Sequence, residues 1–411
     1  MNGLKSPVGL FYFFLIVFIF IVPVDSGFII KLISSIYVFL LWVGYFIGSS
    51  LQCKRKLINY NAFISKPRSL FVVVFLISSQ LVLSIYAGKY YTGLNFSNAF
   101  QNLFLGDSNY AIYQAYFNSE SLSSFSINKL PAIFSMFYVK FIFIFMLYFF
   151  VVKKDGRYDF LVVLFSAFSI VVLAVFRGTN FEFFEILVAL VCSFYIRSIF
   201  NSNYKFPFFK VFALASFLVY IYVIQIMFRY SFEYSISCNN AFCYDYESVF
   251  HQLLPVISSA FYNLSAYFYF APDYMARWFI YYLDNNLFLT VFVPGSGVFY
   301  EYTGKWLCGE EFSCGPTWAP DFEIFTYFLG LPLVALLIIF LAFFQKYLKI
   351  AAGLNFIDFL GFYLITLQLY ALPVGNFLFV SSANQLMLIL FLTLFVFRYL
   401  SRKSKKITLR G

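Results

Sequence analysis

The chain has 411 residues, of which 62% are hydrophobic and only 11% are charged. A soluble globular protein carries about 25% charged residues, so this composition excludes a soluble enzyme and indicates a single membrane domain over residues 1–411. The formal net charge is +10. Because the basic residues lie beside the apolar segments rather than in one patch, this charge does not indicate nucleic-acid binding.

Apolar segments of membrane-spanning length recur along the chain and predict an all-α, polytopic fold with about ten transmembrane helices. They lie roughly at 8–24, 28–50, 69–88, 131–152, 158–176, 181–200, 208–228, 324–344, 355–373 and 378–398. Two further segments, 248–270 and 278–294, are also apolar, but His251, Pro255 and scattered polar residues favour surface-lying or re-entrant helices there. Counting both as spans would give twelve.

The orientation follows from Lys and Arg, which are enriched on the cytoplasmic side of membrane proteins. With the N-terminus in the cytoplasm, the inner connections, the C-terminal tail and Lys5 account for twenty of the 28 basic residues. We therefore expect both termini to be cytoplasmic and two long segments, 89–130 and 229–323, to face outward.

The second outward segment differs from the rest of the chain in composition. It contains ten of the 18 acidic residues and only three basic ones, for a formal charge of −7, and it holds the only histidine, His251. Four cysteines in an oxidising compartment should pair. Three connectivities are open, and we favour two local pairs over a zinc site, whose ligand spacing is absent. The cysteines are Cys238, Cys243, Cys308 and Cys314.

Arg177 ends an apolar span on the outer side, and the next span begins almost at once. Thr179 and Glu182 have capping-box spacing, which gives Glu182 a structural explanation. An arginine beside a helix N-terminus forms an anion site, and its guanidinium matches phosphate oxygens. The alternative is an interfacial arginine whose head group reaches toward water.

Arg229 and Arg277 are the other outward arginines. Each binds a ligand or forms an ion pair with an acidic residue nearby in sequence. The candidate acidic partners are Glu233, Asp273 and Asp284.

Lys140 lies inside the fourth predicted span. A lysine within a membrane is costly and faces protein or a water-filled cavity. It therefore lies on a substrate path or pairs with an acidic residue such as Glu185, which also lies within a span.

His251 is the side chain best suited to act as a general base near neutral pH. The carboxylates of Asp273, Asp321 and Glu323 compete for that role, although acidic residues at a helix start, such as Glu323, are also simply stabilising. The chain has no phosphate loop, nucleotide motif, metal-ligand cluster or serine elbow. We therefore expect no cofactor and a membrane-borne substrate that is already activated.

Two local patterns and the layout of the whole chain carry a family resemblance. The patterns are Arg177-Gly178 at an outer span end and the run GPTWAPDFEIFTYFLGLP over 315–332, with an acidic residue and an aromatic before Phe-x-Gly. With one large outer loop in the second half, the chain resembles repeat-unit polymerases of the Wzy type, which make O-antigen or capsule and are related to O-antigen ligases. The four-cysteine loop departs from that family.

The resemblance implies a GT-C-like membrane glycosyltransferase in the bacterial inner membrane. It would join repeat units linked to undecaprenyl pyrophosphate at the periplasmic face, without metal or nucleotide, beside membrane lipids, a chain-length regulator and a flippase. Arg177, Arg229 and Arg277 would hold the pyrophosphate, with Lys140 on the substrate path and His251 or Glu323 as the base. The alternatives are a lipid-linked oligosaccharide flippase, which would carry more ionisable residues along a central cavity, and an O-antigen ligase.

Overall fold

The computed structural model describes most of the chain. The described residues are 6–53, 70–105, 109–119, 126–152, 157–179, 181–201, 204–207, 243–286, 288–294, 321–375 and 381–408, with single residues at 209, 213, 216, 220 and 378. Within these ranges the regular structure is helical apart from one pair of two-residue strands.

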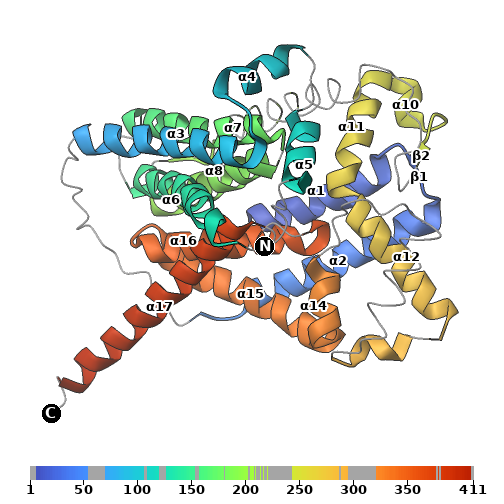
Figure 1. The fold of residues 1–411 in the computed structure, drawn as a ribbon. Helices are drawn as coiled ribbons and strands as arrows, with labels where there is room; N and C mark the ends of the chain where they lie inside the picture. Colours follow the sequence, from blue (N-terminus) through green and yellow to red (C-terminus); the bar gives the residue numbers. More distant parts are fainter. Residues whose placement is uncertain are drawn as a thin grey trace. The chain divides into compact units, whose positions relative to one another are not determined.

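The elements follow one another along the chain as labelled in Figure 1. The first half contains α1 (Pro7–Ile21), β1 (Val24–Asp25), α2 (Phe28–Ser50), α3 (Leu70–Thr92), α4 (Phe96–Leu105), α5 (Asn109–Ser119), η1 (Ile127–Lys129), α6 (Leu130–Val152), α7 (Arg157–Arg177) and α8 (Phe181–Phe200). The second half contains β2 (Cys243–Tyr244), α10 (Val249–Leu253), α11 (Pro255–Phe268), α12 (Phe270–Asp284), η2 (Phe288–Phe292), α14 (Asp321–Leu329), α15 (Leu331–Ala352), α16 (Phe356–Val374) and α17 (Ser382–Thr408).

Seven helical segments of the described chain are long and apolar enough to cross a membrane: α2, α3, η1 with α6, α7, α8, α15 and α16. Two shorter apolar helices, α1 and the first part of α17, accompany them. At 1.5 Å per residue, a helix of about 20 residues matches the hydrocarbon thickness of a bilayer. These helices confirm the prediction of an all-α protein embedded in a membrane. The predicted span 208–228 lies almost entirely outside the described residues.

The chain divides into two compact units. The first comprises Met1–Lys54, Phe232–Lys346 and Ile365–Phe377, and the second comprises Arg55–Ser231, Tyr347–Leu364 and Leu378–Gly411. The division therefore falls within α15 and α16, and each unit has buried hydrogen bonds of its own.

In the first unit, α1 and α2 pack together, and the connection between them carries β1. Strand β1 pairs antiparallel with β2, so that Val24 lies opposite Tyr244. Helix α12 packs on α2, where the Ser34 hydroxyl donates a hydrogen bond to the Pro272 carbonyl at 3.1 Å. The segment after residue 242 is thus fastened to the first helical hairpin.

In the second unit, α3, α6, α7 and α8 lie side by side as a bundle (Figure 1), and α17 packs against α6. The buried Gln80 amide donates to the carbonyls of Val139 and Ser166, which joins α3 to α6 and α7. A buried polar group costs free energy unless it is hydrogen-bonded, so this bridge fixes the three helices relative to one another.

The eighth predicted span, 324–344, is interrupted in the structure. Helix α14 ends at Leu329, Gly330 has a φ of +73°, and α15 begins at Leu331. Glycine takes this left-handed conformation readily at a helix end, and Pro332 then sits in the first turn of α15, where a missing N–H costs nothing.

The connecting segments also contain more helix than the sequence predicts. Segment 248–270 is split into α10 and α11 at Leu254, because the residue before Pro255 disfavours helical geometry. Helix α12 begins at Phe270 rather than near 278, and segment 89–130, which the sequence predicts to face outward, contains α4 and α5.

Candidate functional site

The end of α7 places Arg177 by a specific backbone turn. The Gly178 N–H donates to the Val175 carbonyl at 3.3 Å, and the Thr179 N–H donates to the Ala174 carbonyl at 3.2 Å. These are the two hydrogen bonds of a Schellman motif, with Gly178 as the left-handed residue at a φ of +59°. Arg177 is therefore the last residue of α7, where a cation interacts favourably with the helix dipole.

Gly178 also lets a neighbouring helix approach. A Cβ at this position would collide with the backbone of Tyr110, near the start of α5. The Asn109 side chain reinforces the approach, because its amide donates to the Ala99 carbonyl of α4 at 2.8 Å and the Val175 carbonyl of α7 at 2.9 Å. One turn further along α5, Tyr113 consequently reaches Arg177.

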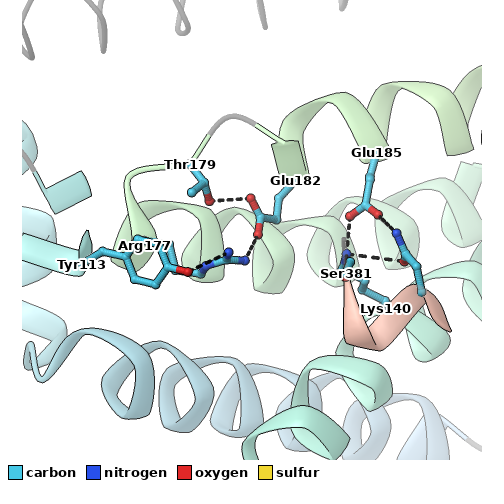
Figure 2. Close-up of polar contacts among 8 residues, drawn as sticks. Tyr113, Lys140, Arg177, Thr179, Glu182, Glu185 and Ser381 are labelled. Carbon is cyan, nitrogen blue, oxygen red and sulfur yellow. Dashed lines mark hydrogen bonds and ion pairs between the residues drawn. The ribbon is translucent and has the colours of Figure 1, made fainter. Parts of the chain in front are cut away.

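Arg177 is held by a buried carboxylate (Figure 2). Its Nη1 lies 2.5 Å from Oε1 of Glu182, and the Thr179 hydroxyl donates to the other carboxylate oxygen at 2.6 Å. The Tyr113 hydroxyl is 3.4 Å from Nη2, and the guanidinium carbon is 5.1 Å from the centre of the Tyr113 ring. The Glu182 side chain is 0% exposed, whereas 24% of the Arg177 side chain is exposed. No described residue accepts a hydrogen bond from the buried Arg177 Nε, so the guanidinium retains a donor that it does not use.

A second ion pair lies further along α8 (Figure 2). The Lys140 Nζ of α6 is 2.5 Å from Oε2 of Glu185, and the Asn384 amide of α17 donates to Oε1 at 2.5 Å. Lys140 also donates to the Ser381 hydroxyl at 3.2 Å and to the Asn384 side-chain oxygen at 3.5 Å. Three side-chain oxygen atoms thus lie within 3.5 Å of the Lys140 Nζ. Of the two alternatives for Lys140, the structure shows the ion pair with Glu185.

The two carboxylates belong to one face of α8, because Glu182 and Glu185 are three residues apart. Two cations and two anions compensate each other, which is what burial in a low-dielectric interior requires. Ionisable groups within membrane helices are expensive and mark functional paths or paired structural sites. This charged row, defined as Arg177, Glu182, Lys140 and Glu185, is the candidate functional site of the second unit.

The first unit has its own buried ion pair on α12. The Arg277 Nε donates to Oδ2 of Asp273 at 2.9 Å, one helical turn away. Asp273 is 1% exposed, and burial raises the pKa of its carboxyl above the ordinary aspartate value, while the positive charge of Arg277 opposes that rise. The structure thus shows for Arg277 the ion-pair alternative, with one of the predicted partners.

His251 lies on α10 in the first unit and is partly buried. Its Nδ1 is 2.6 Å from the Tyr244 hydroxyl, which donates to the Ser258 hydroxyl at 2.7 Å. Burial raises the pKa of the Tyr244 phenol above its usual value. Tyr244 therefore stays protonated under ordinary conditions.

Several residues singled out from the sequence lie outside the part of the chain that the structure describes. Arg229, Cys238, Cys308 and Cys314 lie outside the described residues, and so does the side chain of Glu323 on α14. Cys243 is disulfide-bonded, whereas Cys53 and Cys192, both among the described residues, are not part of a disulfide.

The sequence did not point to four residues that complete these clusters. No sequence pattern marked Tyr113 or Tyr244, because each contacts its partner only through the tertiary packing of its segment. Ser381 and Asn384 had a weak one, since they are polar residues at the start of an apolar span.

The fold and the charged row define a class, a polytopic helical membrane protein with compensated charges inside its bundle. No protein-family model, curated protein or solved structure matches the chain. Among the described residues, no group of three or more His, Cys, Asp and Glu side chains could hold a metal ion.

Proposed function

We propose that this protein is a Wzy-type polymerase, which joins lipid-linked repeat units into O-antigen or capsule without metal or nucleotide. The observation that carries the proposal is the Arg177 guanidinium. It lies at a helix end that we assign to the outer face, and it is partly exposed although the buried Glu182 holds it. Arginine binds phosphate through several N–H groups at once, which suits a pyrophosphate.

The proposed reaction transfers a growing glycan from undecaprenyl pyrophosphate to a hydroxyl of the next repeat unit. The bond between the anomeric carbon and the pyrophosphate oxygen breaks, a bond from that carbon to the acceptor oxygen forms, and the hydroxyl proton goes to a base. Arg177 would stabilise the negative charge on the departing pyrophosphate, and His251 would accept the proton. The two residues belong to different compact units, so each role is proposed for the residue by itself.

The other residues predicted to bind the substrate fall into two groups. Lys140 and Arg277 are each held by a carboxylate, which supports structural roles in preference to pyrophosphate binding. Arg229 and Glu323 remain proposed as a pyrophosphate ligand and as a second candidate base. The proposal also includes the bacterial inner membrane as the location, with both termini in the cytoplasm.

Deleting the gene in its host and separating the surface polysaccharide on a gel tests the function. A polymerase mutant retains the core with a single repeat unit, because transfer of one unit does not need polymerisation. Complete absence of repeat units would overturn the proposal.

A matched pair of arginine variants tests the site. Arg398 pairs with the buried Asp358 at 2.6 Å and is 20% exposed, which resembles the pairing of Arg177 with Glu182 in the same unit. We expect Arg177→Ala to abolish polymerisation in the complemented strain and Arg398→Ala to preserve it, with both proteins present in the membrane. Normal chain length in Arg177→Ala would remove Arg177 from the site.

A flippase is the second candidate, and the Lys140–Glu185 pair favours it. Transporters place ionisable pairs within membrane helices, as this chain does between α6 and α8. The same deletion separates the two functions, because loss of a flippase leaves no repeat unit on the surface.

A further inference from the structure

Tyr244 is fixed in place by the backbone around it. Its strand β2 pairs with β1, where Val24 lies opposite, and the next N–H, that of Asp245, donates to the Pro23 carbonyl at 3.1 Å. The preceding residue, Cys243, is disulfide-bonded, and the Tyr244 side chain is buried. The phenol is therefore held in one position relative to its neighbours.

Its hydroxyl stands between Ser258 and His251. Ser258 is 0% exposed and accepts the phenol proton at 2.7 Å, while His251 Nδ1 lies 2.6 Å from the same phenol oxygen. A phenol has a single proton. Because that proton goes to Ser258, the contact with His251 requires Nδ1 to be the donor. A neutral imidazole has only one N–H, so Nε2 carries the lone pair.

The orientation of the imidazole is fixed as well. The His251 ring stands nearly perpendicular to the rings of Tyr244 and Tyr246, at 89° and 82°, with centroid distances of 5.3 and 5.5 Å. The backbone N–H of His251 donates to the N-cap hydroxyl of Ser248 at 3.2 Å, and this hydrogen bond anchors the short helix α10. Within the described residues, no hydrogen bond forms to Nε2.

We propose that Tyr244 is a positioning residue that holds His251 as the Nδ1–H tautomer and leaves the Nε2 lone pair as the basic site for a substrate hydroxyl. The proposal rests on the base role assigned to His251 above. When the proton moves from a sugar hydroxyl to Nε2, the imidazole becomes an imidazolium. The Nδ1–H bond to Tyr244 keeps the same direction before and after the transfer, so no group has to rotate.

The tautomer can be observed directly, because the chain has a single histidine. The full chain would be labelled with ¹⁵N-histidine, purified through a tag without histidine, placed in lipid nanodiscs and studied by NMR above about pH 8, where an imidazole is neutral. The ¹⁵N chemical shifts distinguish a protonated ring nitrogen from a bare one. We expect a protonated Nδ1 and a bare Nε2.

Three variants test the cause. Tyr244→Phe removes the acceptor for Nδ1–H, and Ser258→Ala removes the acceptor for the phenol proton, so that the phenol donates to Nδ1 instead. We expect both to shift the major population to the Nε2–H tautomer, while the control Tyr246→Phe retains Nδ1–H. A wild-type imidazole with Nε2–H, or a Tyr244→Phe protein that keeps Nδ1–H, would overturn the proposal.

Polymer length in complemented cells separates this proposal from the function on which it rests. We expect His251→Ala and Tyr244→Phe to lose long chains while the proteins remain in the membrane. If His251→Ala polymerises normally, the base role fails whatever the tautomer. If His251→Ala loses long chains and the wild-type tautomer is Nε2–H, the positioning role of Tyr244 alone fails.

Discussion

The carboxylate of Glu185 lies 2.5 Å from the ammonium of Lys140 and joins α8 to α6 inside the second unit. Asn384 of α17 contacts both members of the pair through its side-chain amide. Each charge thus has a partner of opposite sign and a polar neighbour, a closed arrangement that a membrane interior tolerates.

Breaking this pair from one side should be costly. Lys140→Met leaves an uncompensated Glu185, and Glu185→Leu leaves an uncompensated Lys140, so each should destabilise the protein by about 3–5 kcal/mol. The double variant Lys140→Met with Glu185→Leu should recover most of that loss. Thermal unfolding in detergent would measure the cycle, and additive losses would contradict the coupling.

The same double variant tests what the pair does. If the pair is structural, the double variant restores normal polysaccharide chain length together with stability. Restored stability without restored activity would instead assign Lys140 or Glu185 to the reaction or to transport.

The sequence offered this pair as one of two alternatives for Lys140, the other being a place on the substrate path, because a charge within a membrane needs a partner or a water-filled cavity. For Arg277 it left ligand binding and an ion pair open, with Asp273 among three acidic candidates nearby in sequence. It missed the pairing of Arg177 with Glu182, because the spacing from Thr179 to Glu182 already explained Glu182 as a helix cap. The partner of His251 could not be predicted either, since it depends on a two-residue strand pairing between segments more than 200 residues apart.

The helix boundaries show the same limit. Apolar length predicted the seven helices that are long enough to cross a membrane, but the interruption at Gly330 required weighing a Gly-Leu-Pro signal against a continuous apolar run. Helices α4 and α5 lie in a segment of mixed polarity, and α5 is fixed by tertiary hydrogen bonds of Asn109 that no periodicity reveals.

Glu182 should compete with an anion for Arg177. A charge of opposite sign within hydrogen-bond distance typically shifts the pKa of its partner by about one to three units, which is a factor of about ten to a thousand in the protonation equilibrium. Glu182→Gln removes the negative charge beside Arg177 and should therefore tighten the binding of inorganic pyrophosphate about tenfold. Calorimetry on the purified full chain would measure this effect. The control Arg177→Gln should abolish the binding, and weaker binding by a folded Glu182→Gln protein would show that the carboxylate positions Arg177 rather than competing for it.

Gly178 should be more sensitive to substitution than another glycine with a positive φ. Gly27 has a φ of +75° and no atom within 4 Å of the point that a Cβ would occupy, whereas a Cβ on Gly178 would strike the Tyr110 backbone. Gly27→Ala should cost only backbone strain, about 1–3 kcal/mol, because its φ of +75° with a ψ of 150° is a conformation that almost only glycine adopts. Gly178→Ala should cost left-handed strain of about 1–2 kcal/mol and about 1–3 kcal/mol more through the collision. Equal unfolding temperatures for the two variants would show that α5 can retreat from α7 without loss.

The Asp273–Arg277 pair should make stability depend on pH with a defined sign. An aspartate in an unfolded chain has a pKa of about 3.9. In the folded protein the pKa of Asp273 is raised above that ordinary value. The folded protein therefore holds this proton more tightly than the unfolded chain does. The resulting stabilisation is present at low pH and is lost as the pH rises from about 4 through the folded pKa.

Replacing Arg277 should extend this loss of stability toward neutral pH. Arg277→Met removes the charge that opposes the rise in the Asp273 pKa, so the carboxyl of the variant must ionise, while buried, at a higher pH. The unfolding temperature of Arg277→Met should consequently fall further below that of the wild type at about pH 8 than at about pH 5. Asp273→Asn with Arg277→Met, which has no carboxyl at this position, should lose that difference. An equal deficit at both pH values in Arg277→Met would mean that Arg277 stabilises α12 by packing and not through the charge of Asp273.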